Sequence, residues 1–165
     1  LGGGAAVAGG RGEQLEPLPA LSDCWLVLAA PDSEIDRKTA RLYGALLPED
    51  FSQGTRVARV ADALRERRLP DPTDLENTFA RPLLEVLPEI ARLHATFKRA
   101  GAPFVALSGA GPTHYSIVRE LRDAIRIARS IRQDRPFPMR VLIARPTGPG
   151  PLIRREKTID SIETL

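Results

Sequence analysis

The sequence predicts an α+β domain with a split βαβ arrangement, in which a sheet containing antiparallel strands carries helices on one face. Three observations support this fold class. The uncharged run Cys24–Ala30 is typical of a central strand buried on both faces. Phe104–Val118 predicts two strands around a small-residue loop, and Met139–Ala144 predicts a last strand. Helical patterns fill the connections, so the expected order is strand, several helices, strand, strand, helix, strand.

A short hairpin is expected before the central strand. Ala5–Ala8 and Gln14–Leu18 form two strand-like runs, and a glycine-rich turn over residues 9–12 separates them. Arg11 lies in that turn.

Two helices are expected early in the first long connection. Apolar residues at helical spacing predict a helix over Ile35–Leu47, which Pro48 ends. A second helix is predicted over Gln53–Arg67. Its apolar face comprises Val57, Val60, Ala61 and Leu64.

Three more helices follow. One is predicted over Leu75–Val86, with Thr73 or Asp74 as its N-cap, and the next over Pro88–Arg99, with Gly101 just past its end. After the two strands around the loop, a helix over about residues 119–132 is predicted. The apolar stripe of that helix consists of Leu121, Ile125, Ala128 and Ile131.

Composition excludes several classes of site. Cys24 is the single cysteine, so neither an intrachain disulfide nor a zinc site with several cysteines is possible. His94 and His114 are 20 residues apart with no ligand cluster near them, which predicts no metal site. The glycine-rich start over residues 1–12 resembles neither a membrane span nor a signal peptide. The use of cysteine fits a reducing compartment, so a cytoplasmic protein without a membrane partner is expected.

Positive charge is concentrated in the last third of the chain. Residues 119–157 carry 11 basic and 4 acidic side chains, whereas the whole chain has a net charge of +3. Such a segment can meet phosphates or nucleic acid, or it can be a solvated helix face. No aromatic residues alternate with the arginines of the 119–135 helix, so we predict no nucleic-acid partner. Residues 147–165 are expected to form a disordered tail.

The loop Ser108-Gly109-Ala110-Gly111 is the most informative segment. Two glycines spaced two apart allow left-handed backbone, and consecutive N–H groups in such a loop can bind an anion. A tight hairpin between buried strands and a loop that contacts phosphate are both compatible with this pattern. Ser108 lacks the Gly-x-Ser-x-Gly context of a nucleophile.

Several segments, in order, resemble the 4-diphosphocytidyl-2-C-methyl-D-erythritol kinases of the GHMP kinase superfamily. The resemblance covers residues 2–145. It rests on the Gly3–Glu13 hairpin, the strand Trp25–Pro31, the Lys38–Tyr43 helix, the Leu75–Phe79 and Leu87–Ile90 segments, and the Ala106–Thr113 loop, which is similar to the third motif of the superfamily. A small departure is Arg81, where an acidic or neutral residue is more usual. The resemblance implies the ferredoxin-like C-terminal domain of a GHMP kinase.

The resemblance also implies an activity and site residues. The family transfers the γ-phosphoryl group of ATP, with Mg²⁺, to the 2-hydroxyl of the cytidyl-methylerythritol substrate. Tyr43 would stack on the cytosine, Thr39 would offer a hydroxyl to the substrate, and Arg11 would face the diphosphate. The loop of Ser108, Gly109, Ala110 and Gly111 would support the active site near the phosphates.

One departure concerns catalysis. The family's nucleotide loop and its catalytic aspartate and lysine belong to the N-terminal half, and no residues here match them. The resemblance places the catalytic residues upstream of Leu1, with the aspartate only a few residues before it. We therefore expect no catalytic residue in this chain, a missing N-terminal half as its partner, and no activity of the chain alone.

The expected organisation has three parts. A hairpin from the preceding domain occupies residues 1–20, the C-terminal domain residues 21–146 and the tail residues 147–165. The alternative to a kinase fragment is a stand-alone ligand-binding or regulatory module without catalysis.

Overall fold

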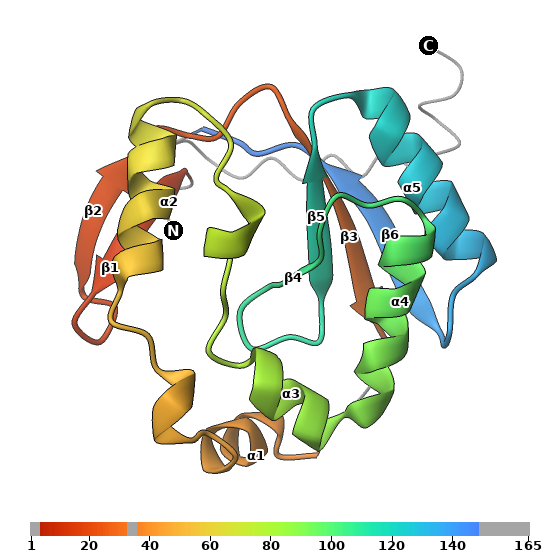
Figure 1. Ribbon diagram of the computed structural model, residues 1–165, viewed down its shortest axis with the longest axis horizontal. Helices are drawn as coiled ribbons and strands as arrows, with labels where there is room; N and C mark the ends of the chain where they lie inside the picture. Colours follow the sequence, from red (N-terminus) through yellow and green to blue (C-terminus); the bar gives the residue numbers. More distant parts are fainter. Residues whose placement is uncertain (1–3, 33–35, 149–165) are drawn as a thin grey trace.

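A computed structural model describes residues 4–32 and 36–148, and in this part of the chain two separate sheets are present (Figure 1). The larger sheet has four strands in the order β4-β5-β3-β6, and every neighbouring pair is antiparallel. Its strands are β3 (Trp25–Pro31), β4 (Ala106–Leu107), β5 (His114–Val118) and β6 (Met139–Ala144). This order is that of a split βαβ fold, so the predicted fold class is confirmed.

Strand β3 lies at the centre of the sheet, as its uncharged sequence predicts. It pairs with β5 from Trp25↔Val118 to Ala29↔His114 and with β6 from Leu26↔Ala144 to Pro31↔Met139. Strand β4 is shorter than the predicted run from Phe104, because it is an edge strand that pairs with β5 only at residues 106 and 107.

Helices α4 (Ala91–Arg99) and α5 (Leu121–Gln133) cover one face of this sheet (Figure 1). The core lies between them and the sheet. It includes Val27, Ala29, Leu93, Phe97, Ile127 and Ile131, which are fully buried or nearly so. The buried stripe of α5 is rotated from the predicted one, since Ala124 and Ile127 are buried whereas Leu121 and Ile125 are only partly covered. No helix in the described ranges is long and apolar enough to cross a membrane.

The long connection between β3 and β4 carries the additional helices. Three are α-helices and three are short 3-10 turns. They are α1 (Lys38–Gly44), η1 (Pro48–Asp50), α2 (Thr55–Arg65), η2 (Pro72–Asp74), α3 (Ala80–Val86) and η3 (Pro88–Ile90). The predicted start of the first helix at Ile35 lies outside the described residues.

The predicted start and N-cap of the third helix are wrong. Asp71, not Thr73 or Asp74, caps the local turn, because its carboxylate accepts the Thr73 N–H at 2.8 Å. Helix α3 begins only at Ala80, because the Asn77 side chain accepts the Phe79 N–H at 2.9 Å. Such side-chain bonds offer the backbone an alternative to the helical ladder.

The predicted hairpin is confirmed as β1 (Ala5–Gly9) paired with β2 (Gln14–Leu18) in a sheet of its own. It lies beside α2, and Arg65 of α2 forms an ion pair with Glu16 of β2 (Figure 1). Leu1, before which the catalytic residues are expected, lies outside the described residues, as does most of the expected tail. The position of the catalytic residues therefore stays a prediction.

Ser116 on β5 provides a test of the core. Its Oγ is buried without a hydrogen-bond partner in the described residues, whereas the buried hydroxyl of Thr96 donates to the Arg92 carbonyl at 3.0 Å. Removing an unsatisfied polar group relieves a desolvation penalty, whereas removing a bonded one loses about 1 kcal/mol. We expect Ser116→Ala to raise the free energy of unfolding by up to about 1 kcal/mol and Thr96→Val to lower it by a similar amount. Urea unfolding of both variants measures this, and a clear loss of stability in Ser116→Ala would contradict it.

Candidate functional site

Helix α1 presents the two residues expected to contact substrate. Thr39 and Tyr43 are four residues apart, so they lie on the same face of the helix, and both are exposed. Leu42, next to Tyr43 in the sequence, is fully buried and anchors the helix in the core. Tyr43 is 61% exposed, and the Phe79 ring lies edge-on to it, with 5.2 Å between centroids and 73° between planes. A supported aromatic ring therefore faces solvent.

The loop of residues 108–111 forms a tight turn between β4 and β5. The Ser108 N–H donates to the Thr113 carbonyl and the Gly111 N–H donates to the Ser108 carbonyl, both at 2.9 Å. The loop is thus a hairpin turn, which was one of the two interpretations of its sequence. Contact with phosphate remains a prediction. Ser108 and Gly109 are exposed, and Ala110 and Gly111 are partly covered.

The two glycines of this loop have different surroundings. Gly109 and Gly111 both have positive φ, +55° and +66°. A Cβ added at Gly109 would meet no atom within 4 Å. A Cβ at Gly111 would lie 2.7 Å from Leu83 Cδ2 and 2.8 Å from Leu107 Cδ1. Gly111 is therefore required for close packing against α3, and Gly109 leaves the outer side of the loop open.

Asn77 attaches the loop to the segment before α3. Its Nδ2 group donates to the Leu107 carbonyl at 3.1 Å and to the Gly109 carbonyl at 2.8 Å. Its Oδ1 accepts the Phe79 N–H. One amide side chain thus connects the end of β4, the glycine loop and the residue that packs against Tyr43.

Lys38 attaches the same loop to α1. Its Nζ donates to the Gly111 carbonyl, 73 residues along the chain, and this contact is partly buried. The structure therefore brings together two of the predicted site segments, helix α1, which carries Thr39 and Tyr43, and the 108–111 loop. The sequence analysis quoted Lys38, Asn77 and Phe79 as part of a resemblance but gave them no role. An Asn two residues before an aromatic at a helix start is the local signal that could have indicated one of them.

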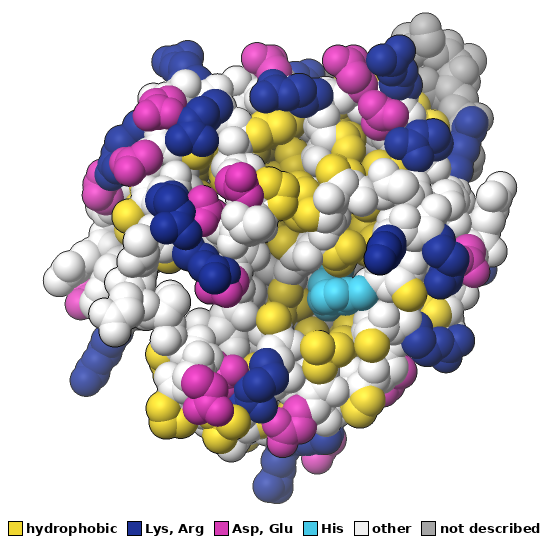
Figure 2. Space-filling model, in the orientation of Figure 1, with side chains coloured by type: hydrophobic (Ala, Val, Ile, Leu, Met, Phe, Trp, Pro, Cys, Tyr) yellow, Lys and Arg dark blue, Asp and Glu magenta, His cyan; other side chains and the backbone are white. Residues whose placement is uncertain are grey.

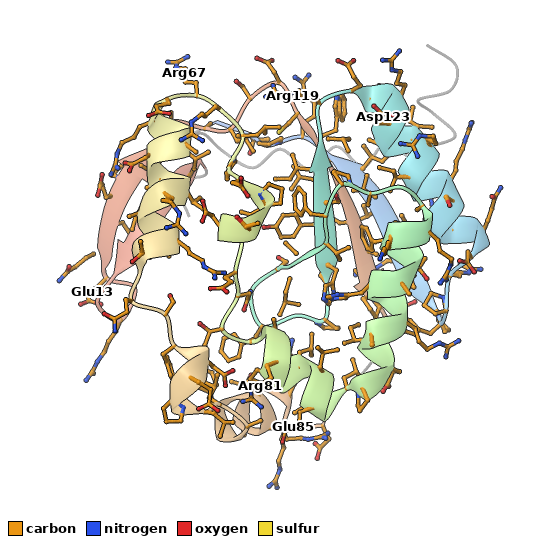
Figure 3. The ribbon with its side chains drawn as sticks, viewed as in Figure 1. Glu13, Arg67, Arg81, Glu85, Arg119 and Asp123 are labelled. Carbon is orange, nitrogen blue, oxygen red and sulfur yellow. The ribbon has the colours of Figure 1, made fainter. Side chains whose placement is uncertain are left out.

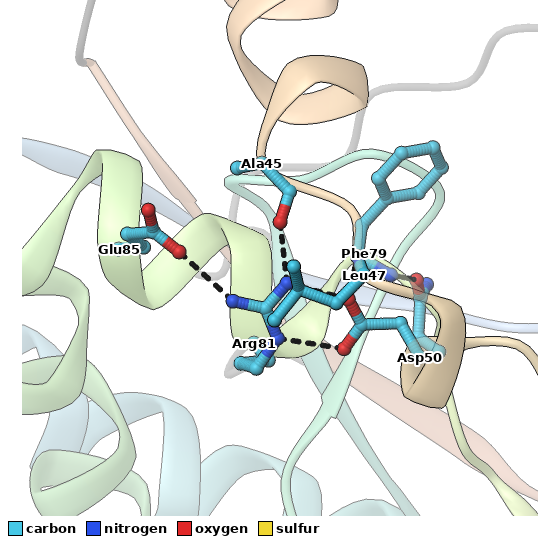
Figure 4. Close-up of polar contacts among 7 residues, drawn as sticks. Ala45, Leu47, Asp50, Phe79, Arg81 and Glu85 are labelled. Atoms are coloured by element: carbon cyan, nitrogen blue, oxygen red, sulfur yellow. Dashed lines mark hydrogen bonds and ion pairs between the residues drawn. The ribbon is translucent and has the colours of Figure 1, made fainter.

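Arg81 fixes the end of α1 (Figure 4). Its guanidinium donates to the Ala45 carbonyl just after α1 and pairs with Asp50 of η1 and Glu85 of α3. Arg81, followed by the Leu47 N–H, lowers the pKa of Asp50 to about 2. The unusual residue at position 81 therefore has a structural explanation, because it connects α3, η1 and α1.

Arg11 lies apart from the other predicted site residues. It is exposed in the hairpin turn, where its N–H donates to the Glu13 carboxylate. Figure 3 shows Glu13 at the hairpin and Arg81 on α3 at well-separated positions. Within the described residues no hydrogen bond or ion pair joins Arg11 to α1 or to the glycine loop, so its diphosphate role remains a prediction.

A groove of about 520 Å³ is lined by Asn77 and Leu107 among others, with apolar side chains along it and histidine at its edge (Figure 2). His114 is only 2% exposed, and its ring lies edge-on to that of His94 with 4.7 Å between the ring centroids. Its Nδ1 lies 2.8 Å from the Pro112 carbonyl, and burial lowers its pKa to about 4. His114 is thus a buried strand residue beside the loop. In the described part of the chain, no three His, Cys, Asp or Glu side chains form a group that could hold a metal ion.

Comparison with protein families matches residues 55–135 to the model described as GHMP kinases C terminal. The four-stranded order, the helix layer and this match define the class, and the chain contains a GHMP kinase C-terminal domain.

Two curated relatives share one name within the GHMP kinases. A protein from Dehalococcoides mccartyi named 4-diphosphocytidyl-2-C-methyl-D-erythritol kinase is 34% identical over 135 residues, which cover 79% of this chain and 46% of that protein. A protein of the same name from a Geobacillus species is 32% identical over 142 residues, covering 85% of this chain and 48% of that protein. The chain spans about half the length of these relatives and matches their C-terminal part.

Solved structures agree on the fold. The crystal structure of 4-(cytidine 5'-diphospho)-2C-methyl-D-erythritol kinase superposes with a TM-score of 0.63 at 25% identity, over 82% of this chain and 48% of that one. Homoserine kinase from Cytophaga hutchinsonii gives a TM-score of 0.61 at 16% identity, over 88% of this chain and 49% of that one. The second likeness concerns the fold alone.

The buried imidazole predicts an acid-sensitive fold. The pKa of His114 is about 4 in the folded chain and 6.5 when unperturbed, so between these values the unfolded chain binds more protons. The free energy of unfolding should fall as the pH drops from 6.5 to 4, by about 3 kcal/mol in full, and stay reduced below pH 4. His114→Asn keeps a donor for the Pro112 carbonyl and should flatten this dependence. Urea unfolding at pH 7.5, 5.5 and 4.5 measures it, and equal slopes in both proteins would refute the assignment.

The two loop glycines predict different costs of substitution. Ala at position 109 should lose about 1–2 kcal/mol of stability, because positive φ is strained for any residue with a Cβ. Ala at position 111 should lose that amount and about 1–3 kcal/mol more, because its Cβ would overlap the Leu83 and Leu107 side chains. Thermal unfolding of Gly109→Ala and Gly111→Ala provides the comparison. Equal losses would show that contact with α3 is not limiting.

Proposed function

We propose that this chain is the substrate-binding part of an ATP-dependent kinase. The proposed reaction transfers the γ-phosphoryl group of ATP to the 2-hydroxyl of 4-diphosphocytidyl-2-C-methyl-D-erythritol in non-mevalonate isoprenoid biosynthesis. The observation that carries this proposal is the connection of α1 to the 108–111 loop. Lys38 bonds the loop directly, and Tyr43 reaches it through Phe79 and Asn77. A cytidine diphosphate ligand needs such a pair of neighbouring surfaces, one for a base and one for phosphates. The relatives' names support the choice of substrate.

Tyr43 is proposed to stack on the cytosine. The Tyr43 ring is 61% exposed and therefore accessible to a base, and ring stacking contributes about 0.5–1.5 kcal/mol beyond the area it buries. Thr39, one turn earlier on the same face, would offer its hydroxyl to the substrate. These roles follow from the family resemblance, and the exposure and spacing of the two side chains support them.

The loop and Arg11 are proposed to serve the phosphates. The outer side of Gly109 is open, so a phosphate group can approach the backbone there without meeting a side chain. Arg11 would reach the diphosphate from the hairpin turn, since a guanidinium can bind phosphate through two parallel hydrogen bonds.

ATP and Mg²⁺ are proposed as the cosubstrates of the intact enzyme. Among the described residues no three His, Cys, Asp or Glu side chains form a group that could hold a metal ion. We therefore assign no metal ligand to this chain and derive no catalytic step through the ion. The proposed contribution of this chain is to bind and orient the phosphoryl acceptor. Such positioning is a large part of catalysis in phosphoryl transfer.

The proposed organisation follows the resemblance. The segments are residues 1–20, 21–146 and 147–165, and the proposed location is the cytoplasm. In the full-length protein, the catalytic aspartate and lysine are proposed to precede Leu1.

The test is phosphoryl transfer from ATP to 4-diphosphocytidyl-2-C-methyl-D-erythritol, by a full-length protein that contains this chain and by the chain alone. Activity of the full-length protein only is expected. Tyr43→Ala should raise KM about 5–15-fold with a smaller effect on kcat, because stacking contributes similarly in the ground state and the transition state. Tyr43→Phe keeps the ring and should stay near the wild type.

Two results would contradict this proposal. A large fall of kcat in Tyr43→Ala with unchanged KM would exclude the stacking role. A folded full-length protein without any transfer activity would favour the ligand-binding module instead.

A further inference from the structure

Four side chains form a closed path of contacts around the proposed substrate site. Tyr43 contacts Phe79, the Phe79 N–H donates to Asn77, and Asn77 donates to the Leu107 and Gly109 carbonyls of the loop. Lys38, on the same helix as Tyr43, donates to Gly111 at the far end of that loop. The surface for the base and the surface for the phosphates are therefore connected on both sides.

We propose that Asn77 is a positioning residue that fixes the separation between the Tyr43 ring and the 108–111 loop, so that a nucleoside diphosphate engages both at once. The inference rests on the proposed function for the identity of the ligand. Asn77 itself would not contact the reacting atoms, because its amide is already bonded to the protein.

An amide is the side chain that suits this position. The two N–H bonds of the Asn77 Nδ2 group are directed at two carbonyls, and its oxygen faces an N–H donor. A carboxylate would keep the bond from Phe79 but would place an oxygen against the Leu107 and Gly109 carbonyls. An aliphatic side chain would lose all three bonds.

Asn77 is connected to Tyr43 through the Phe79 ring, which packs against the core. Phe79 follows Asn77 by two residues and is half-buried beside the core. Its ring contacts the Tyr43 ring edge to face, and Tyr43 is 61% exposed beside it. Displacing Asn77 would move Phe79 and the loop independently, so the distance between the two binding surfaces would no longer be fixed.

Fixed separation has a thermodynamic signature. When two parts of one ligand bind two surfaces held at the right distance, the second part binds at a high effective concentration. A variant that loosens the distance should weaken the joined ligand while each separate part binds as before. A residue needed only for folding would weaken all ligands together.

The experiment titrates cytidine, pyrophosphate and cytidine diphosphate into the wild-type chain, Asn77→Leu and Thr78→Val. Leu is uncharged and similar to Asn in shape, so it removes the three bonds without adding charge near the phosphates. Thr78 is the adjacent half-buried residue, and it has no side-chain hydrogen bond among the described residues, so it is the matched control. Calorimetry should show cytidine diphosphate weakened at least about tenfold in Asn77→Leu, with each separate part changed less than about threefold. Thr78→Val should bind like the wild type.

Two binding results would overturn the inference. One is an equal loss for all three ligands in Asn77→Leu, which indicates a general structural role. The other is unchanged binding of cytidine diphosphate. If Asn77→Leu does not fold, Lys38→Met removes the other connection of the loop and should give the same selective loss, and its absence would count equally against a fixed separation.

A ligand-free measurement separates this inference from the proposed function. In NMR spectra of the free chain, Asn77→Leu should shift both the Gly109 amide and the Tyr43 ring resonances, and Thr78→Val should shift neither. If the wild-type chain binds none of the three ligands but both resonances shift, the substrate assignment fails and the positioning role stands. A shift of Gly109 alone would show that Asn77 anchors the loop without affecting Tyr43, which refutes the positioning role.

Discussion

The candidate site depends on the close approach of α3 to the turn between β4 and β5. Leu83 of α3 packs so closely against Gly111 that a Cβ at this position would displace the Leu83 side chain. This contact places the start of α3, and with it Asn77 and Phe79, against the edge of the sheet. Arg81 on the same helix then binds the end of α1. The position of α1 relative to the loop thus depends on this packing contact as well as on the hydrogen bonds of Lys38, Asn77 and Arg81.

Polar side chains around the candidate site connect separate segments of the chain. Around α1, the loop and α3, side chains bond backbone carbonyls of other segments, as Lys38, Asn77 and Arg81 do. Carbonyls in short turns have no ladder partner, so each such bond also satisfies a backbone group. Buried His114 stays neutral just behind the same loop, since burial lowers its pKa. The loop therefore rests on an uncharged support at neutral pH, and a cationic side chain reaches it from α1.

The sequence predicted the strands and most helices from hydrophobic patterns, and the order of these elements along the chain predicted the split βαβ arrangement. It missed the start of α3, because a single side-chain bond from Asn77 outweighs weak helix propensity over Leu75–Phe79. It also missed the roles of Lys38 and Asn77, because their partners lie 73 and about 30 residues away and are backbone carbonyls, which carry no side-chain signal. Hydrogen bonds across the loop show the expected hairpin turn, and its contact with phosphate stays a prediction.

Neighbouring residues of α1 show how folding and binding requirements are divided. Leu42 is fully buried and Tyr43 is mostly exposed, although both carry a large apolar surface. Leu42 stabilises the fold by leaving water, whereas an exposed tyrosine ring contributes little to stability, since most of its apolar area stays hydrated. A single exposed aromatic is common on protein surfaces and proves nothing alone. Here the ring is held edge-on by Phe79, and Phe79 is bonded to the residue that holds the loop. Ordering an exposed side chain costs conformational entropy. Because the Tyr43 ring is already ordered, a base that stacks on it would lose less entropy on binding.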